Sequence, residues 1–183
     1  MTLTNSYQKI AEQYLGYSYG SLYVRIYAKV NSQDENNLTS EVSYQSRLYY
    51  NGNSYIIAQG QTKVVTSGTG ATTATTSWQN FEGGGSGYYY SGETVVKTIT
   101  GTVTHDEDGT ASITTSAVFT SAGSWGWEGT ASGSANLPVI ETSTLRLGVN
   151  GSWKKATPYL AVNGQWVKCK AYTRVNNSWK KGV

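Results

Sequence analysis

The chain has 183 residues, of which 38% are hydrophobic and 14% are charged, and it contains one cysteine, Cys169. A single cysteine excludes an internal disulfide, and no stretch approaches the roughly 18 consecutive apolar residues that a membrane-spanning helix requires. The first residues lack a basic region followed by an apolar run, so we expect no signal peptide and no membrane insertion.

The first 140 residues have the pattern of an all-β protein. Residues 21–30 alternate apolar and polar side chains, as half-buried strands do. In chain order, strands are expected over 21–30, 39–50, 54–58, 93–104, 110–120 and 129–137. Asn51-Gly52 predicts a two-residue type I′ turn between the second and third of these strands. Residues 7–15 fit either a short helix or a strand, and residues 66–76 fit either a loop or an edge strand.

Seven or eight short strands without a helical period predict a β-sandwich or jelly-roll-like domain over residues 1–140. A different pattern follows from residue 143. Val-Asn-Gly-Ser-Trp-Lys-Lys begins at Val149 and recurs in related form from Val162 and from Val175. Trp153, Trp166 and Trp179 are spaced by 13 residues. Each copy predicts a strand, a tight turn and a Trp-bearing strand, so residues 143–183 are expected to form a β-hairpin repeat unit.

The charge is divided between these two parts. Residues 1–141 carry six Lys or Arg and eleven Asp or Glu, a balance of −5. Residues 142–183 carry eight Lys or Arg and no acidic residue, a balance of +8. Such a segment attracts polyanions: a cell-wall polymer, an acidic neighbouring protein (including the acidic part of a second copy) or nucleic acid. Nucleic acid is the least expected partner, because the chain has no recognised nucleic-acid-binding motif.

Several segments together resemble the minor structural proteins of siphophages. These are residues 22–48, the His-x-x-Asp-Gly turn between two strands at 101–110, the segment 129–138 and the Val-Asn-Gly-x-Trp-Lys hairpins. The resemblance implies a tail-associated virion component, made in the host cytoplasm, that contacts other virion proteins and has no established active site. We expect a homo-oligomer, since edge strands that pair or pack between protomers bury surface.

The residues themselves give little reason to expect an enzyme. His105 is the only histidine and lies in a turn, where bonding within its own loop is the favoured interpretation over a catalytic base. Asp106 and Asp108 form only a fragment of a calcium loop. Cys169 has no histidine beside it in sequence and is interpreted as a packing residue. We therefore expect no catalytic residue, no metal and no cofactor.

Aromatic and basic residues are the candidates for ligand contact. Tyr88–Tyr90 with Trp125 and Trp127 could stack on sugar rings, or lie in the core or at a protomer interface. The repeat tryptophans could stack on one another as the core of a hairpin array, or face a ligand. The full set proposed for glycan or polyanion contact is Trp153, Trp166, Trp179, Lys154, Lys155, Lys168, Lys180, Lys181, Tyr88, Tyr89, Tyr90, Trp125 and Trp127.

The leading functional hypothesis is a bacteriophage virion structural protein, associated with the tail or baseplate, that contributes to attachment to the host envelope. Many copies on a symmetric particle would turn weak individual sites into strong attachment. The alternatives are a capsid decoration protein and a stand-alone carbohydrate-binding module. A capsid decoration protein would bind the shell and ignore host surfaces. A stand-alone module would bind one soluble glycan as a monomer.

Overall fold

A computed structural model describes the chain except for residues 17–19, 53–55, 78, 84–89, 123–127, 142–144, 170, 176–177 and 182–183. The backbone alone is described for residues 20, 56–61, 79–83, 90–91, 145–148, 152–155, 172–175 and 178–181. The described residues are strands, turns and connecting segments, and among them no helix could cross a membrane. The prediction of an all-β protein is confirmed.

Among the described residues, nine strands belong to the N-terminal part of the chain and six to the C-terminal part. The first nine are β1 (Gln8–Tyr14), β2 (Gly20–Asp34), β3 (Thr39–Gly52), β4 (Ile56–Gly68), β5 (Ala74–Thr75), β6 (Gln79–Gly83), β7 (Tyr90–Thr104), β8 (Ser112–Ser121) and β9 (Glu128–Asn136). The last six are β10 (Leu145–Val149), β11 (Ser152–Ala156), β12 (Tyr159–Val162), β13 (Gln165–Lys168), β14 (Tyr172–Val175) and β15 (Ser178–Lys181).

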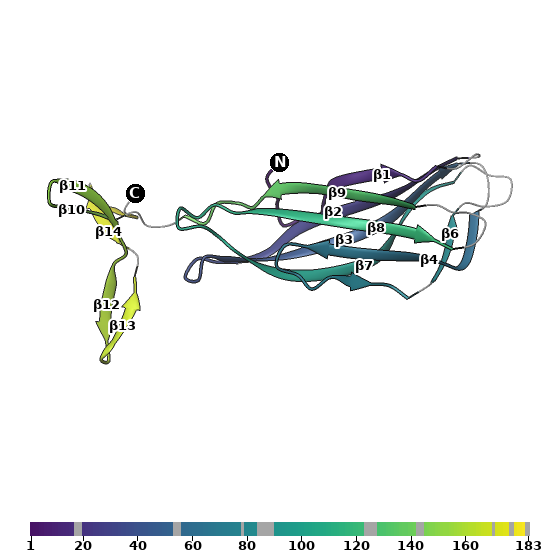
Figure 1. The fold of residues 1–183 in the computed structure, drawn as a ribbon. Coiled ribbons are helices and arrows are strands. Elements are labelled where there is room, and N and C mark those ends of the chain that lie inside the picture. Colours follow the sequence, from purple (N-terminus) through teal and green to yellow (C-terminus); the bar gives the residue numbers. More distant parts are fainter. Residues whose placement is uncertain are drawn as a thin grey trace.

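The first nine strands form an elongated sandwich of two antiparallel sheets (Figure 1). One sheet has the order β1-β2-β3-β7 and the other has the order β5-β4-β8-β9, with β6 also paired to β4. Two isolated backbone bridges join the sheets at their margins. Thr2 pairs with Asn136 beside β9, and Ala71 pairs with Gly101 of β7. At these two points the edge strands β9 and β7 thus have a backbone partner on their outer side.

The core lies between the two sheets and follows the alternation read from the sequence. On β2 the buried side chains are those of Leu22, Val24, Ile26, Ala28 and Val30. Facing strands contribute further apolar groups, which gather into two clusters along the length of the sandwich. Ser46 of β3 and Thr66 of β4 are fully buried and share a hydrogen bond of 2.6 Å between their hydroxyls. Each hydroxyl thus has the partner that burial requires.

The structure corrects one local prediction and decides two others. Asn51-Gly52 is not a turn: both residues extend β3, where Asn51 pairs with Ser21 and Ser91. The next strand, β4, pairs with β8 in the opposite sheet, so the predicted hairpin partner of β3 is also wrong. Residues 7–15 contain a strand, β1, rather than a helix. Residues 66–76 contain the end of β4 and the short edge strand β5.

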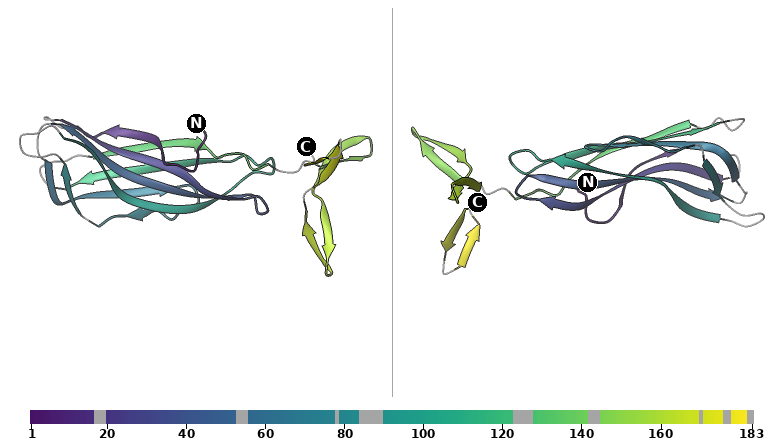
Figure 2. Two further views of the ribbon diagram at one scale, coloured as in Figure 1. Left: turned by 180° about the vertical axis from the view of Figure 1, so that it is seen from behind. Right: turned by 90° about the horizontal axis from the view of Figure 1, so that it is seen from below.

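The last six strands form three two-stranded hairpins, each a separate antiparallel sheet. They lie beyond one end of the sandwich and point in different directions (Figures 1 and 2). Asn150 and Asn163 each have a φ of 51°, and the glycines that follow them have φ of 76° and 79°. Positive φ at both central positions is the type I′ geometry that Asn-Gly predicted. The predicted boundary at 140–143 falls between β9 and β10.

Candidate functional site

The β12–β13 hairpin gives the most complete view of the repeat. Tyr159 pairs with Lys168 and Ala161 pairs with Trp166. Because side chains alternate along a strand, these four residues share one face of the hairpin. The four intervening residues, which occupy the other face, are Leu160, Val162, Gln165 and Val167. The hairpin therefore has one face that carries its aromatic and cationic side chains, which we call the Trp–Lys face.

The Trp–Lys face is open to solvent. Trp166 is 75% exposed and Tyr159 is 54% exposed, and both Lys168 and Ala161 are exposed as well. Of the two alternatives for the repeat tryptophans, the stacked core is therefore wrong for Trp166. The short strands bring too few neighbours to cover an indole, and the residue directly opposite is an alanine. The Trp166 side chain thus lies at the surface of the hairpin, and a ligand-facing role for it stays a prediction.

The same register recurs in the other two hairpins. Trp153 pairs with Gly148 and Trp179 pairs with Arg174, in the positions that match Ala161 and Trp166. The lysine two residues beyond each Trp, Lys155 or Lys181, matches Lys168. The remaining predicted lysines, Lys154 and Lys180, occupy the alternate positions that match Val167. Register thus separates the repeat lysines into two groups, which the sequence-based set had combined.

The structure gives less information about the other predicted contact residues. Tyr90 begins β7, with its backbone alone described. Tyr88, Tyr89, Trp125 and Trp127 lie outside the described residues, so the proposed glycan platform that they would form stays a prediction.

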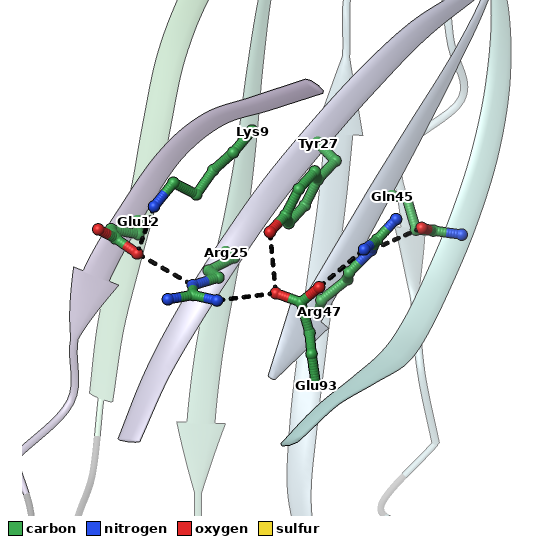
Figure 3. Close-up of polar contacts among 7 residues, drawn as sticks. All are labelled: Lys9, Glu12, Arg25, Tyr27, Gln45, Arg47 and Glu93. Atoms are coloured by element: carbon green, nitrogen blue, oxygen red, sulfur yellow. Dashed lines mark hydrogen bonds and ion pairs between the residues drawn. The ribbon is translucent and has the colours of Figure 1, made fainter. Parts of the chain in front are cut away.

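A second concentration of aromatic and charged side chains covers the outer face of the β1-β2-β3-β7 sheet, and the sequence reading did not identify it. Its centre is Glu93 of β7 (Figure 3). The Glu93 carboxylate accepts hydrogen bonds from Arg25 Nη1 at 3.1 Å, Arg47 Nη1 at 2.7 Å and the Tyr27 hydroxyl at 2.9 Å. Arg25 also donates to Glu12, at 2.9 Å. We call these five residues the Glu93 cluster.

The pairing of the strands explains why an acid is needed at this position. Arg25 and Arg47 are directly opposite each other on β2 and β3, an arrangement in which like charges repel. Glu93 lies between them and binds both. Partial burial acts to raise the pKa of Glu93, but the hydrogen bonds from Arg47, Arg25 and Tyr27 outweigh it, and the pKa lies below its ordinary value.

Tyrosine rings cover the two guanidinium groups. Arg25 Cζ lies 3.8 Å from the centroid of the Tyr49 ring, and Arg47 Cζ lies 4.0 Å from that of Tyr27. Both distances are short for cation–π contacts. The cations and rings of this face thus stack on one another within the chain. This arrangement favours a structural role for the Glu93 cluster over that of an open stacking platform.

His105 is held on both sides by its own protein. Its Nδ1 lies 2.7 Å from the Gly109 carbonyl oxygen and its Nε2 lies 2.7 Å from the Ser40 hydroxyl, and the side chain is buried. Since a carbonyl only accepts, Nδ1 carries the hydrogen. The expected bond within its own loop is confirmed, and Ser40 adds a tie to β3. Asp108 accepts hydrogen bonds from Thr110, as a turn aspartate does.

The remaining features offer little chemistry. Within the described part of the chain, no group of three or more His, Cys, Asp or Glu is placed to hold a metal ion. A groove of about 620 Å³ crosses β4, β8 and β9, and its lining consists of Ser, Thr and Gly alone. Hydroxyls in it bond one another, as in Ser67 with Ser116 at 2.8 Å. Such a lining supplies neither a titratable group nor an aromatic ring.

Comparisons of the chain with protein-family models, with curated proteins and with solved structures found no match.

Proposed function

We propose that this chain is a non-enzymatic structural protein of a bacteriophage particle, associated with the tail, and that its C-terminal hairpins attach to the host envelope. The observation that carries the attachment role is the exposure of the Trp–Lys face of the β12–β13 hairpin, with Trp166 75% exposed. A large exposed aromatic side chain is a common feature of recognition surfaces.

Three further observations support the proposal. The virion assignment follows from the sequence resemblance, which covers most of the chain. The sandwich and the hairpins are distinct parts of the chain, so one can be built into a particle while the other contacts a surface (Figure 1). Residues 142–183, which contain the hairpins, also carry eight basic residues and no acidic one, and this charge suits the anionic polymers of a bacterial cell wall.

Electron microscopy of phage particles labelled with an antibody against the full chain tests the virion assignment. We expect label on the tail. Label on capsid faces would favour the decoration alternative, and particles without label would refute the virion role.

Binding of the labelled full-length protein to a panel of intact Gram-positive cells tests the attachment role. We expect strain-selective binding that weakens as salt increases, because the basic segment supplies part of the attraction. A variant with Trp153, Trp166 and Trp179 all replaced by alanine is the comparison. Equal binding by that variant would exclude the hairpins as the attachment site.

A further inference from the structure

The Trp–Lys face has the arrangement of a site for a ring and an adjacent anion. Trp166 pairs with Ala161, so the small side chain opposite leaves the indole ring uncovered. Lys168 follows two positions later on the same face. In an extended strand, the Cα atoms of two such residues are about 6.5 to 7 Å apart. Tyr159, directly opposite Lys168, adds a second aromatic residue to the same face.

The charge of the segment limits what can bind there. Residues 142–183 contain no acidic side chain that could neutralise the lysines from within the segment. A neutral sugar polymer would use the indole and leave the lysine unused. A polyanion without rings would use the lysine and leave the indole unused. A ligand that carries both rings and negative charge uses the whole face.

The directions of the hairpins favour a polysaccharide over a single-stranded nucleic acid. A nucleic-acid strand binds best where a continuous basic groove follows its backbone and successive bases stack on neighbouring aromatic rings. Here each hairpin carries one Trp, and the three hairpins point in different directions (Figure 2). Three separately oriented hairpins suit a branched or densely packed polymer, whose repeating units can be bound independently.

We infer that the Trp–Lys face of the β12–β13 hairpin binds an anionic polysaccharide, with the indole stacked on a pyranose ring and the lysine paired with a phosphate or carboxylate on the polymer. This inference names the ligand class of the attachment site and so rests on the proposed function. In the β12–β13 hairpin the roles belong to Trp166, Lys168 and Tyr159. The backbone register places Trp153 with Lys155, and Trp179 with Lys181, at the matching positions of the other two hairpins.

Binding measurements on the purified full-length chain test the inference without phage particles or cells. Four immobilised probes separate ring from charge: a phosphomannan, the same mannan after removal of phosphate, inorganic polyphosphate and oligothymidylate. We expect the phosphomannan to bind more tightly than any of the other three. Tightest binding to oligothymidylate would overturn the assignment in favour of nucleic acid. If polyphosphate binds as tightly as the phosphomannan, the site recognises negative charge alone and the sugar ring contributes nothing.

Variants locate the site on one face of the hairpin. Trp166→Ala is expected to weaken phosphomannan binding about tenfold, whereas Trp166→Phe retains most of it because an aromatic ring remains. Lys168→Gln should weaken binding and reduce its dependence on salt. Gln165→Ala is the matched control, because Gln165 is exposed on the same strand but on the opposite face. An equal loss in Gln165→Ala would refute the face assignment.

The two proposals fail in distinguishable ways. Phosphomannan binding by a protein that is absent from phage tails would remove the virion role and leave the ligand class intact. A tail-located protein that binds cells but no phosphomannan would remove the ligand class and leave the attachment role intact.

Discussion

Replacing Glu93 with glutamine tests whether one carboxylate holds the outer face of the β1-β2-β3-β7 sheet together. Glutamine has nearly the same shape, so packing is preserved and the negative charge is lost. The change removes the negative charge that faces Arg25 and Arg47 and replaces one of the two accepting oxygens with an NH2 group, which cannot accept, while the two arginines stay opposite each other. The prediction is therefore a loss of stability that arises from charge.

The size of the loss follows from the number and exposure of these bonds. A hydrogen bond to a charged group contributes about 1.5 to 3 kcal/mol, and screening by water lowers this value. The side chains of Arg25, Arg47 and Glu93 are 17%, 21% and 21% exposed, so the screening is partial. We expect Glu93→Gln to reduce the free energy of unfolding by about 2 kcal/mol, which corresponds to roughly 6 °C in Tm.

Urea denaturation followed by circular dichroism measures the effect. Glu128→Gln is the matched control, since Glu128 is an exposed glutamate on β9 and outside the Glu93 cluster. It is expected to change the free energy of unfolding by less than about 0.5 kcal/mol. Equal stability of the two variants at neutral pH would show that the ion pairs of the Glu93 cluster contribute nothing.

The dependence on pH provides a second check with a definite sign. Because folding lowers the pKa of Glu93, its contribution is complete above the ordinary glutamate pKa of about 4.3 and is lost as pH falls through the lower pKa of the folded protein. The difference in stability between the wild type and Glu93→Gln should therefore shrink between pH 7 and about pH 3. A difference that stays constant over this range would refute an electrostatic origin.

Three other substitutions test the interior, each measured by urea denaturation. Gly68→Ala places a β-carbon 2.6 Å from the buried Tyr44 ring and should cost about 2 kcal/mol; an unchanged midpoint would mean that the ring moves freely. Tyr44→Phe removes the hydrogen bond from its hydroxyl to the Thr69 carbonyl, at 2.7 Å, and should cost about 1 kcal/mol. His105→Ala leaves the Ser40 hydroxyl and the Gly109 carbonyl without their imidazole partner and should cost about 2 kcal/mol, with faster hydrogen exchange in residues 105–110.

Local sequence patterns correctly predicted the features that depend on residues close together in the chain. The alternation over residues 21–30 correctly identified a strand and its buried face, because a sheet with one face on a core requires that period. The repeated Asn-Gly dipeptides at 150–151 and 163–164 correctly gave type I′ turns, since few residues adopt positive φ at both central positions. The bonding of His105 to its own loop was equally local, with Gly109 four residues away.

Contacts between segments distant in the chain decided the features that the sequence did not predict. Asn51-Gly52 has the same turn signal as the repeats, yet its flanking strands β2 and β7 keep it extended in the ladder. Glu93 is separated by 68 residues from Arg25 and by 46 from Arg47, so only the pairing of β2, β3 and β7 brings the Glu93 cluster together. The sequence by itself determined the alternating strand at residues 21–30, the Asn-Gly turns of the repeat and the basic Trp repeat. The tertiary structure decided which strands pair, that two arginines share one acid, and that Trp166 faces solvent, because each depends on what lies across a sheet rather than along the chain.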